Sequence, residues 1–248
     1  MDMTPVPAGP TILMLKREGI KLNISRIIIF IVKLVIVGLP LGNIEDISIR
    51  VVKTLDKASV IVCEDTRFFH KLWQKLMNME VLNHKFTGKL MVLNDFNEKH
   101  EVERVVMKDE VILVSDAGMP TISDPGFRLV SRVIEMGGQI ACVPGPTAMT
   151  TALALSGFSA DKVLFLGFLA RKLGKRREIW EWLKTTTGVT VVIYESPRRV
   201  ERLLLEIRET FGDVETCIAR ELTKEHEEVV RDKASEVVAK LRSIKGEM

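Results

Sequence analysis

The stretch Ser115–Gly126, SDAGMPTISDPG, constrains the fold of this chain more than any other part of the sequence. It follows the apolar run Val111–Val114, which is typical of a buried strand, and precedes a helix predicted over Phe127–Gly137. Its glycines permit backbone conformations that a Cβ forbids, and its prolines fix φ and remove hydrogen-bond donors. A strand that enters a rigid polar loop and then a helix is typical of the ligand-binding edge of an open α/β sheet.

Two further loops of this kind follow predicted strands. Gly38–Asn43 comes after a strand expected over Leu34–Val37, and Pro144–Ala148 comes after one expected over Gln139–Val143. The second loop enters a helix predicted over Met149–Ser156, whose first N–H groups are free to bind a polar or anionic group. The three loops together predict a cleft rich in main-chain donors, which suits an uncharged or zwitterionic ligand such as an adenosine-bearing cofactor.

A fourth predicted strand, Val60–Cys63, runs into the polar residues Glu64, Asp65, Thr66 and Arg67. The carboxyl ends of parallel strands are where ligands bind, so these side chains are candidates for a site. The same residues also suit a plain helix start, with Asp65 or Thr66 as the N-cap and Arg67 in solvent.

Strands and helices alternate through the rest of the chain, which predicts an α/β class. Further strands are expected at Leu90–Leu93, Val163–Phe168, Val189–Tyr194 and Glu215–Ala219, and further helices at Ile49–Lys57, Phe68–Met79, Glu101–Lys108, Ile179–Lys184, Val200–Thr210 and Ala234–Leu241. The pattern changes near residues 147–158, so we predict an extension over 1–33, an N-terminal α/β domain over 34–148 and a C-terminal α/β domain over 149–248.

Charge and cysteine content exclude several classes of protein. The 36 Lys and Arg against 33 Asp and Glu give a net charge of +3, and residues 1–34 already carry that excess, so no general basic field marks a nucleic-acid binder. Cys63, Cys142 and Cys217 are scattered in apolar runs and are expected to be buried thiols, and no metal site is expected. Dinucleotide, Walker, nucleophile-elbow and zincin motifs do not occur in the sequence.

Two local features leave alternatives open. Ile27–Val37 is apolar but short and interrupted by Lys33, so we interpret it as leading into a buried strand, with a signal or anchor as the alternative and no membrane span expected. The run Arg171–Arg177 holds five basic residues around Gly174 and is interpreted either as a solvated face or as a mobile loop that neutralises phosphates, with Arg198, Arg199 and Arg202 nearby in the sequence.

Seven stretches, taken in order, resemble the ribosomal RNA small subunit methyltransferase I family of the tetrapyrrole methylase superfamily. They are GLPLGNIEDISIR, CEDTRFFHKL, SDAGMPTISDPGFRLV, VPGPTAMTTALALSGF, FLGFLARKLGKRR, YESPRR and ARELTKEHEE, and the resemblance covers roughly residues 34–247. It implies two α/β domains with an S-adenosylmethionine site between them, a cytoplasmic homodimer, and methylation of a cytidine ribose 2′-hydroxyl in 16S rRNA of the small ribosomal subunit.

The resemblance also implies residue roles. Cofactor contacts are expected from Leu39, Pro40, Asp116, Gly118, Met119, Pro120, Thr147, Ala148, Tyr194 and Ala219. Catalytic and substrate groups are expected from Glu64, Asp65, Arg67 and Lys224. RNA contacts are expected from Arg171, Lys172, Lys175, Arg176 and Arg177.

The sequence departs from the family pattern at several points. Leu39 and Met119 stand where the family has threonine, Arg198 stands where it has histidine, and the family continues into a last strand after the residues at which this chain ends. We therefore expect an unpaired strand edge in the C-terminal domain. Two other functions stay open: methylation of a tetrapyrrole, and a non-catalytic role in RNA binding or ribosome assembly.

Overall fold

The structure is a computed structural model that describes residues 32–246. Residues 1–31 of the expected N-terminal extension, including the first five residues of Ile27–Val37, lie outside the described residues. Among the helices that the structure describes, none is long and apolar enough to cross a bilayer.

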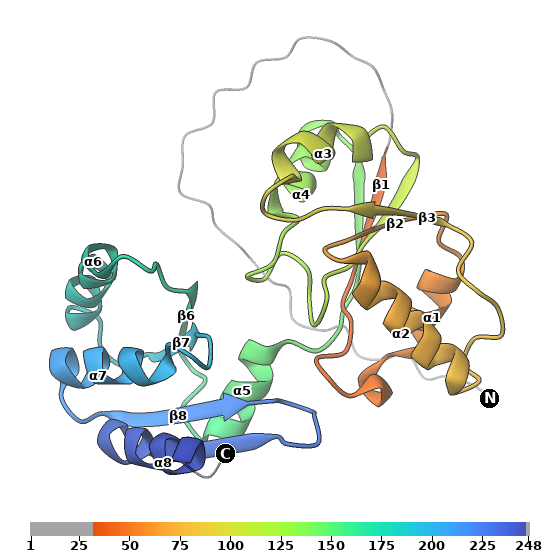
Figure 1. The fold of residues 1–248 in the computed structure, drawn as a ribbon. Coiled ribbons are helices and arrows are strands. Elements are labelled where there is room, and N and C mark those ends of the chain that lie inside the picture. Colours follow the sequence, from red (N-terminus) through yellow and green to blue (C-terminus); the bar gives the residue numbers. More distant parts are fainter. Residues whose placement is uncertain (1–31, 247–248) are drawn as a thin grey trace, which may run out of the picture.

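The first half of the described chain forms a five-stranded parallel sheet in the order β3-β2-β4-β1-β5 (Figure 1). The strands are β1 (Lys33–Val37), β2 (Val60–Cys63), β3 (Lys89–Val92), β4 (Glu110–Leu113) and β5 (Gln139–Val143). Successive side chains of a strand point to opposite faces, so Leu34 and Val35 contribute to different cores. The sheet is therefore apolar on both faces and needs helices on both.

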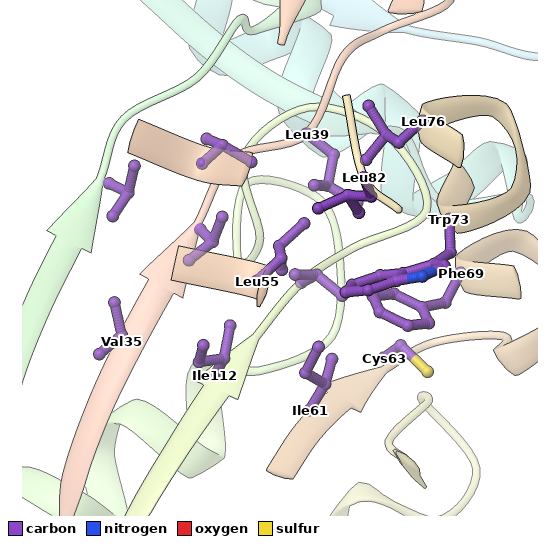
Figure 2. Close-up of a cluster of buried hydrophobic side chains, with 14 residues drawn as sticks. Val35, Leu39, Leu55, Ile61, Cys63, Phe69, Trp73, Leu76, Leu82 and Ile112 are labelled. Atoms are coloured by element: carbon purple, nitrogen blue, oxygen red, sulfur yellow. The ribbon is translucent and has the colours of Figure 1, made fainter. Parts of the chain in front are cut away.

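Four helices cover the two faces of this sheet. They are α1 (Ile49–Asp56), preceded by the 3-10 helix η1 (Ile44–Asp46), α2 (Thr66–Asn78), α3 (Glu98–Val105) and α4 (Phe127–Glu135). Leu55 of α1 and Phe69 and Trp73 of α2 pack on one face, as Figure 2 shows, and residues of α3 and α4 pack on the other. Ser48 is the N-cap of α1, and its Oγ accepts from Val51 N at 3.1 Å.

The second half of the chain forms two separate two-stranded sheets. Its elements are α5 (Ala148–Ser156), β6 (Val163–Phe168), α6 (Leu173–Lys184), β7 (Thr190–Tyr194), α7 (Val200–Phe211), β8 (Glu215–Arg220), β9 (Glu228–Lys233) and α8 (Ala234–Gly246). β6 pairs with β7 in parallel, and β8 pairs with β9 antiparallel. The domain boundary predicted at residues 148/149 falls at the start of α5 and stays a prediction.

The α/β class is confirmed, and three local expectations were wrong. The strand β9 was missed, because the charged residues in EVVRDK obscure its alternation. Helix α6 begins at Leu173, so much of the supposed loop is helical; Gly174 has open space around it and imposes no turn. Only Cys63 of the three thiols is buried, whereas Cys142 is exposed because β5 is an edge strand and Cys217 is partly exposed.

Candidate active site

A cleft of about 330 Å³ opens at the carboxyl ends of strands from both halves of the chain. Its walls come from the loop after β4, the start of α5, the last residues of β6 and β7, and the end of β8 with the loop that follows it. The lining residues are Leu41, Ala117, Gly118, Met119, Ile122, Ser123, Asp124, Thr147, Ala148, Phe168, Tyr194, Ala219, Arg220, Glu221, Leu222 and Lys224. Volumes of this size lie at the small end of the range for small-molecule sites, about 300–1,000 Å³.

Six of the ten residues expected to contact a cofactor line this cleft, and four do not. Those that line it are Gly118, Met119, Thr147, Ala148, Tyr194 and Ala219, and those that do not are Leu39, Pro40, Asp116 and Pro120. Leu39 belongs to the core and is 4% exposed. Its apolar side chain thus occupies a buried position at which the family has the hydroxyl of threonine. Its N–H donates to Gly118 O at 2.8 Å and its O accepts from Gly118 N at 3.0 Å, so Leu39 supports the cleft through its main chain.

The loops after β1 and β5 touch each other main chain to main chain. A Cβ on Gly145 would lie 2.7 Å from the carbonyl carbon and oxygen of Gly38, and a Cβ on Gly38 would lie 2.6 Å from Gly145 N. Real Cβ atoms do not approach backbone so closely, so both positions require glycine. Met119 packs on the same contact, where its Sδ accepts from Gly145 N at 3.3 Å.

Non-glycine residues adopt left-handed backbone conformations in the loops around the cleft. Thr121 and Ser123, after β4, have φ of 72° and 64°, and Glu221 and Thr223, after β8, have φ of 50° and 66°. Such conformations cost free energy and cluster at functional sites. Thr223 Oγ1 accepts from Asn43 N at 3.0 Å, so this bond ties the loop after β8 to the loop after β1. The sequence carried no signal for these conformations.

A buried carboxylate from outside the cleft fixes the end of the loop after β4. Glu98 is 8% exposed, and its Oε1 accepts from Gly126 N at 2.9 Å and from Arg128 N at 3.0 Å. Gly126 is the N-cap of α4 and has no side chain to satisfy these donors, so Glu98 supplies the cap from α3. Local sequence patterns do not indicate this role, because donor and acceptor are far apart in the chain.

Several carboxyl groups meet beside the cleft and repel one another. Burial, together with the charges of Asp116, Asp124, Asp95 and Asp65, raises the pKa of Glu64 to about 7. Burial also raises the pKa of Asp124 to about 6, and it raises the pKa of Asp116, whose Oδ1 is buried with no hydrogen-bond partner. Raised carboxyl pKa values and a buried oxygen without a hydrogen-bond partner are typical of a functional site rather than of a solvated surface.

Asp65 lies next to Glu64 in the chain but has a different environment. Its Oδ1 accepts from Arg67 N at 2.8 Å as the N-cap of α2, so the alternative of a helix start is confirmed. Its carboxylate also pairs with the Arg67 guanidinium, with Oδ2 to Nη2 at 2.5 Å. These hydrogen bonds from Arg67 lower the pKa of Asp65 to about 2, so Asp65 stays ionised and binds a proton far less readily than Glu64.

Of the four residues expected to have catalytic or substrate roles, only Lys224 lines the cleft. Its side chain is half exposed, and its Nζ donates to Glu221 Oε2 at 2.9 Å. Glu64, Asp65 and Arg67 do not line it, and the charge of the lining residue Asp124 is one of the causes that raise the pKa of Glu64. Among the described residues, no group of His, Cys, Asp and Glu is arranged to hold a metal ion.

The five residues expected to contact RNA differ in exposure. Arg171, Lys172, Lys175 and Arg177 are exposed, whereas Arg176 is 5% exposed. The Arg176 guanidinium donates to both carboxylate oxygens of Glu206, at 2.8 and 2.6 Å, and to the carbonyls of Ala170 and Arg171 at 2.8 Å each. Each nitrogen of this guanidinium donates to a group of the protein, so Arg176 has a structural role, and a contact of Arg176 with RNA stays a prediction.

Lining residues outside the expected set come mainly from two places. Asp124 and Ser123 fall within the Gly/Pro loop that the sequence singled out, and Phe168 is the last residue of a predicted strand. Because these three residues lie at or after the carboxyl end of a predicted strand, their position could have indicated that they line the cleft. Arg220 and Leu222 had only the general signal of a polar strand exit.

Comparison with known proteins gives concordant matches. Residues 33–238 match the family of tetrapyrrole (corrin/porphyrin) methylases. The chain is 42% identical over 212 residues to ribosomal RNA small subunit methyltransferase I of Thermotoga maritima, covering 84% of this chain and 90% of that protein. It is 36% identical to the Rickettsia prowazekii protein of the same name, covering 87% and 76%.

Solved structures share the fold at low sequence identity. Cobalt precorrin-4 methyltransferase superimposes with a TM-score of 0.61 at 16% identity, covering 87% of this chain and 91% of that one. Uroporphyrin III C-methyl transferase from Thermus thermophilus superimposes with a TM-score of 0.55 at 16% identity, covering 84% and 90%. These likenesses support the fold.

Proposed function

We propose that this chain, which belongs to the tetrapyrrole (corrin/porphyrin) methylase family, methylates ribosomal RNA of the small subunit. The donor is S-adenosylmethionine, and the acceptor is a cytidine ribose 2′-hydroxyl in 16S rRNA. The observation that carries the proposal is the cleft at the strand ends, with a cluster of proton-binding carboxyls beside it. The names of the relatives support the RNA acceptor, and a ribosomal substrate agrees with a cytoplasmic location.

The residues of the cleft fit such a donor. S-Adenosylmethionine supplies a sulfonium methyl group and carries an ammonium, a carboxylate and an adenosine. Asp124 in the wall, and Asp116 beside it with an unpartnered buried oxygen, suit a positively charged group. The start of α5 at Thr147 and Ala148 suits a carboxylate or hydroxyl, and Tyr194 with Phe168 offers aromatic surface. Gly118 and Met119 complete the wall of the cofactor site.

Glu64 is the general base in this proposal. A ribose hydroxyl is a poor nucleophile, and a base with a pKa near the working pH removes its proton most effectively. Glu64 meets that condition with a pKa of about 7, whereas Asp65, held by Arg67 and with a pKa of about 2, does not. Asp65 and Arg67 instead fix the start of α2, directly after Glu64.

Lys224 stabilises the developing alkoxide. It lines the cleft, and its ion pair with Glu221 holds the ammonium at the loop after β8. A cation at this place lowers the free energy of the alkoxide, and alignment of hydroxyl and methyl supplies much of the remaining rate.

Methyl transfer from labelled S-adenosylmethionine to unmethylated small ribosomal subunits tests these roles. Glu64→Gln and Lys224→Ala should each lower kcat by about 10²–10⁴-fold, the usual range for one acid–base group. Asp65→Asn and Arg67→Ala should have smaller effects, and Glu209→Gln, on the exposed face of α7, is the control for charge. Wild-type rates in both Glu64→Gln and Lys224→Ala would overturn the assignment.

A homodimer is part of the proposal. The edge strand β5 leaves Ile140 37% exposed and Cys142 exposed, so the first sheet has an open edge on which a second copy can pack. Sedimentation of the wild type against Ile140→Lys checks it. A wild-type monomer at all concentrations would contradict this part of the proposal.

A further inference from the structure

A second, smaller cavity lies beside the cleft and is lined mainly by arginine. It has a volume of about 160 Å³, room for roughly five water molecules at about 30 Å³ each. We call it the arginine pocket and define it by Arg171, Arg176, Arg199, Arg202, Glu195 and Glu206. Four guanidinium groups against two carboxylates give it a formal charge of +2, although the chain as a whole is nearly balanced.

The ion pairs within the arginine pocket leave Arg171 unpaired and hold Arg202 only through a carboxylate that it shares with Arg176. Glu206 is taken up by the bidentate pair with buried Arg176, and Glu195 pairs with Arg199 at 2.8 Å. Arg202 reaches only the oxygen of Glu206 that Arg176 already holds, at 3.3 Å, and its side chain is 71% exposed. Among the described residues, the side chain of Arg171 makes no hydrogen bond or ion pair, and it is exposed.

The chain path places the arginine pocket against the cleft. Tyr194 lines the cleft and the next residue, Glu195, lines the pocket, so their Cα atoms are about 3.8 Å apart. Phe168 lines the cleft and Arg171, three residues later, lines the pocket, at most about 11 Å away along an extended chain. Both cavities thus lie at the carboxyl ends of β6 and β7.

We infer that the arginine pocket binds a phosphate group of the RNA backbone, through Arg171 and Arg202, next to the ribose that is methylated. This inference rests on the proposed function. Guanidinium groups bind phosphate oxygens in a bidentate manner, and the phosphates that flank the reacting ribose are the negative charges closest to it. Arg176 and Glu206 do not contact the phosphate; they hold the start of α6 and the middle of α7 so that Arg171 and Arg202 face one cavity.

Binding to unmethylated small ribosomal subunits, measured between about 50 and 200 mM salt, tests the inference. Arg171→Ala and Arg202→Ala should each weaken binding and reduce the slope of log K against log salt by about 0.7–0.9, the value for one phosphate contact. The double variant should lose about twice that slope. Arg208→Ala, also exposed on α7 but outside the pocket, is the matched control and should leave the slope nearly unchanged.

Three outcomes would overturn the inference. Slopes equal to those of Arg208→Ala would mean that neither arginine contacts a phosphate. Weaker binding with an unchanged slope would mean that the arginines act on the fold. Binding of inorganic phosphate alone that Arg202→Ala abolishes, with subunit binding unchanged, would assign the pocket to a free anion. The variants should bind S-adenosylmethionine as the wild type does, as measured by calorimetric titration. Failure of the proposed function would be a different result: the wild-type protein itself would neither bind nor methylate the subunits.

Discussion

Replacing Glu64 with glutamine should change how the stability of this protein depends on pH. The pKa of Glu64 is raised from 4.5 to about 7 in the folded state, chiefly by burial, so the folded state binds this proton more tightly than the unfolded state does. The stability that this group contributes is therefore present below about pH 4.5 and is lost as the pH rises toward about 7. A neutral glutamine has no charge to bury and avoids the loss.

The magnitude follows from the size of the shift. A change of about 2.5 units corresponds to about 3.4 kcal/mol at about 1.36 kcal/mol per unit. Because this carboxyl is partly exposed, solvent screening reduces the expected effect to about 1–2 kcal/mol. Glu64→Gln should thus exceed the wild type in free energy of unfolding by about 1–2 kcal/mol near pH 8, and by less than about 0.5 kcal/mol near pH 5.

Urea unfolding of both proteins across this pH range is the assay. Asp65→Asn is the contrasting control: hydrogen bonds from Arg67 lower the pKa of Asp65 to about 2, so its contribution is present above about pH 3.8 and is lost only as the pH falls toward 2. That variant should be less stable than the wild type near pH 8. Parallel stability curves for wild type and Glu64→Gln would refute the raised pKa, and with it the choice of Glu64 as base.

The remaining predictions concern packing, and urea unfolding measures each of them. Arg176→Ala should lower the free energy of unfolding by about 3–5 kcal/mol, because it leaves the carboxylate of Glu206 in a largely buried position without its bidentate partner; a loss below 1 kcal/mol would contradict this. Gly145→Ala should lower it by more than about 1 kcal/mol, because the new methyl meets the backbone of Gly38 at 2.7 Å. Gly174→Ala, in helix α6 with open space around it, should instead raise it by about 0.5–1 kcal/mol, and a loss there would be against the account.

Local sequence patterns predicted most of the strands of this fold. Apolar runs such as Val60–Cys63 end in polar or glycine-bearing residues, so both the strand and its ligand-binding end could be read from adjacent positions. The strand β9 was missed, because its own charged sequence does not suggest a strand and its pairing with β8 stabilises it.

The candidate site was predictable where a role depends on the loop itself. Gly118 and Thr147 belong to the Gly/Pro loops that were predicted to form a cleft, Tyr194 was expected there from the resemblance to the family, and all three line it. The structural role of Arg176 was hidden because it depends on Glu206, which is 30 residues away in the chain. The difference between Glu64 and its neighbour Asp65 was equally hidden, since it arises from burial and from carboxyls on other loops.

Calorimetric titration of S-adenosylmethionine and S-adenosylhomocysteine into the purified protein is the decisive test of the proposed cofactor site. We expect saturable binding of both compounds at one site per chain, weakened by substitution of cleft residues such as Asp124→Asn and Tyr194→Ala. Binding would leave only the RNA acceptor to be established with unmethylated small subunits. Absence of any heat of binding would contradict the enzyme account and favour a non-catalytic role in RNA binding or ribosome assembly.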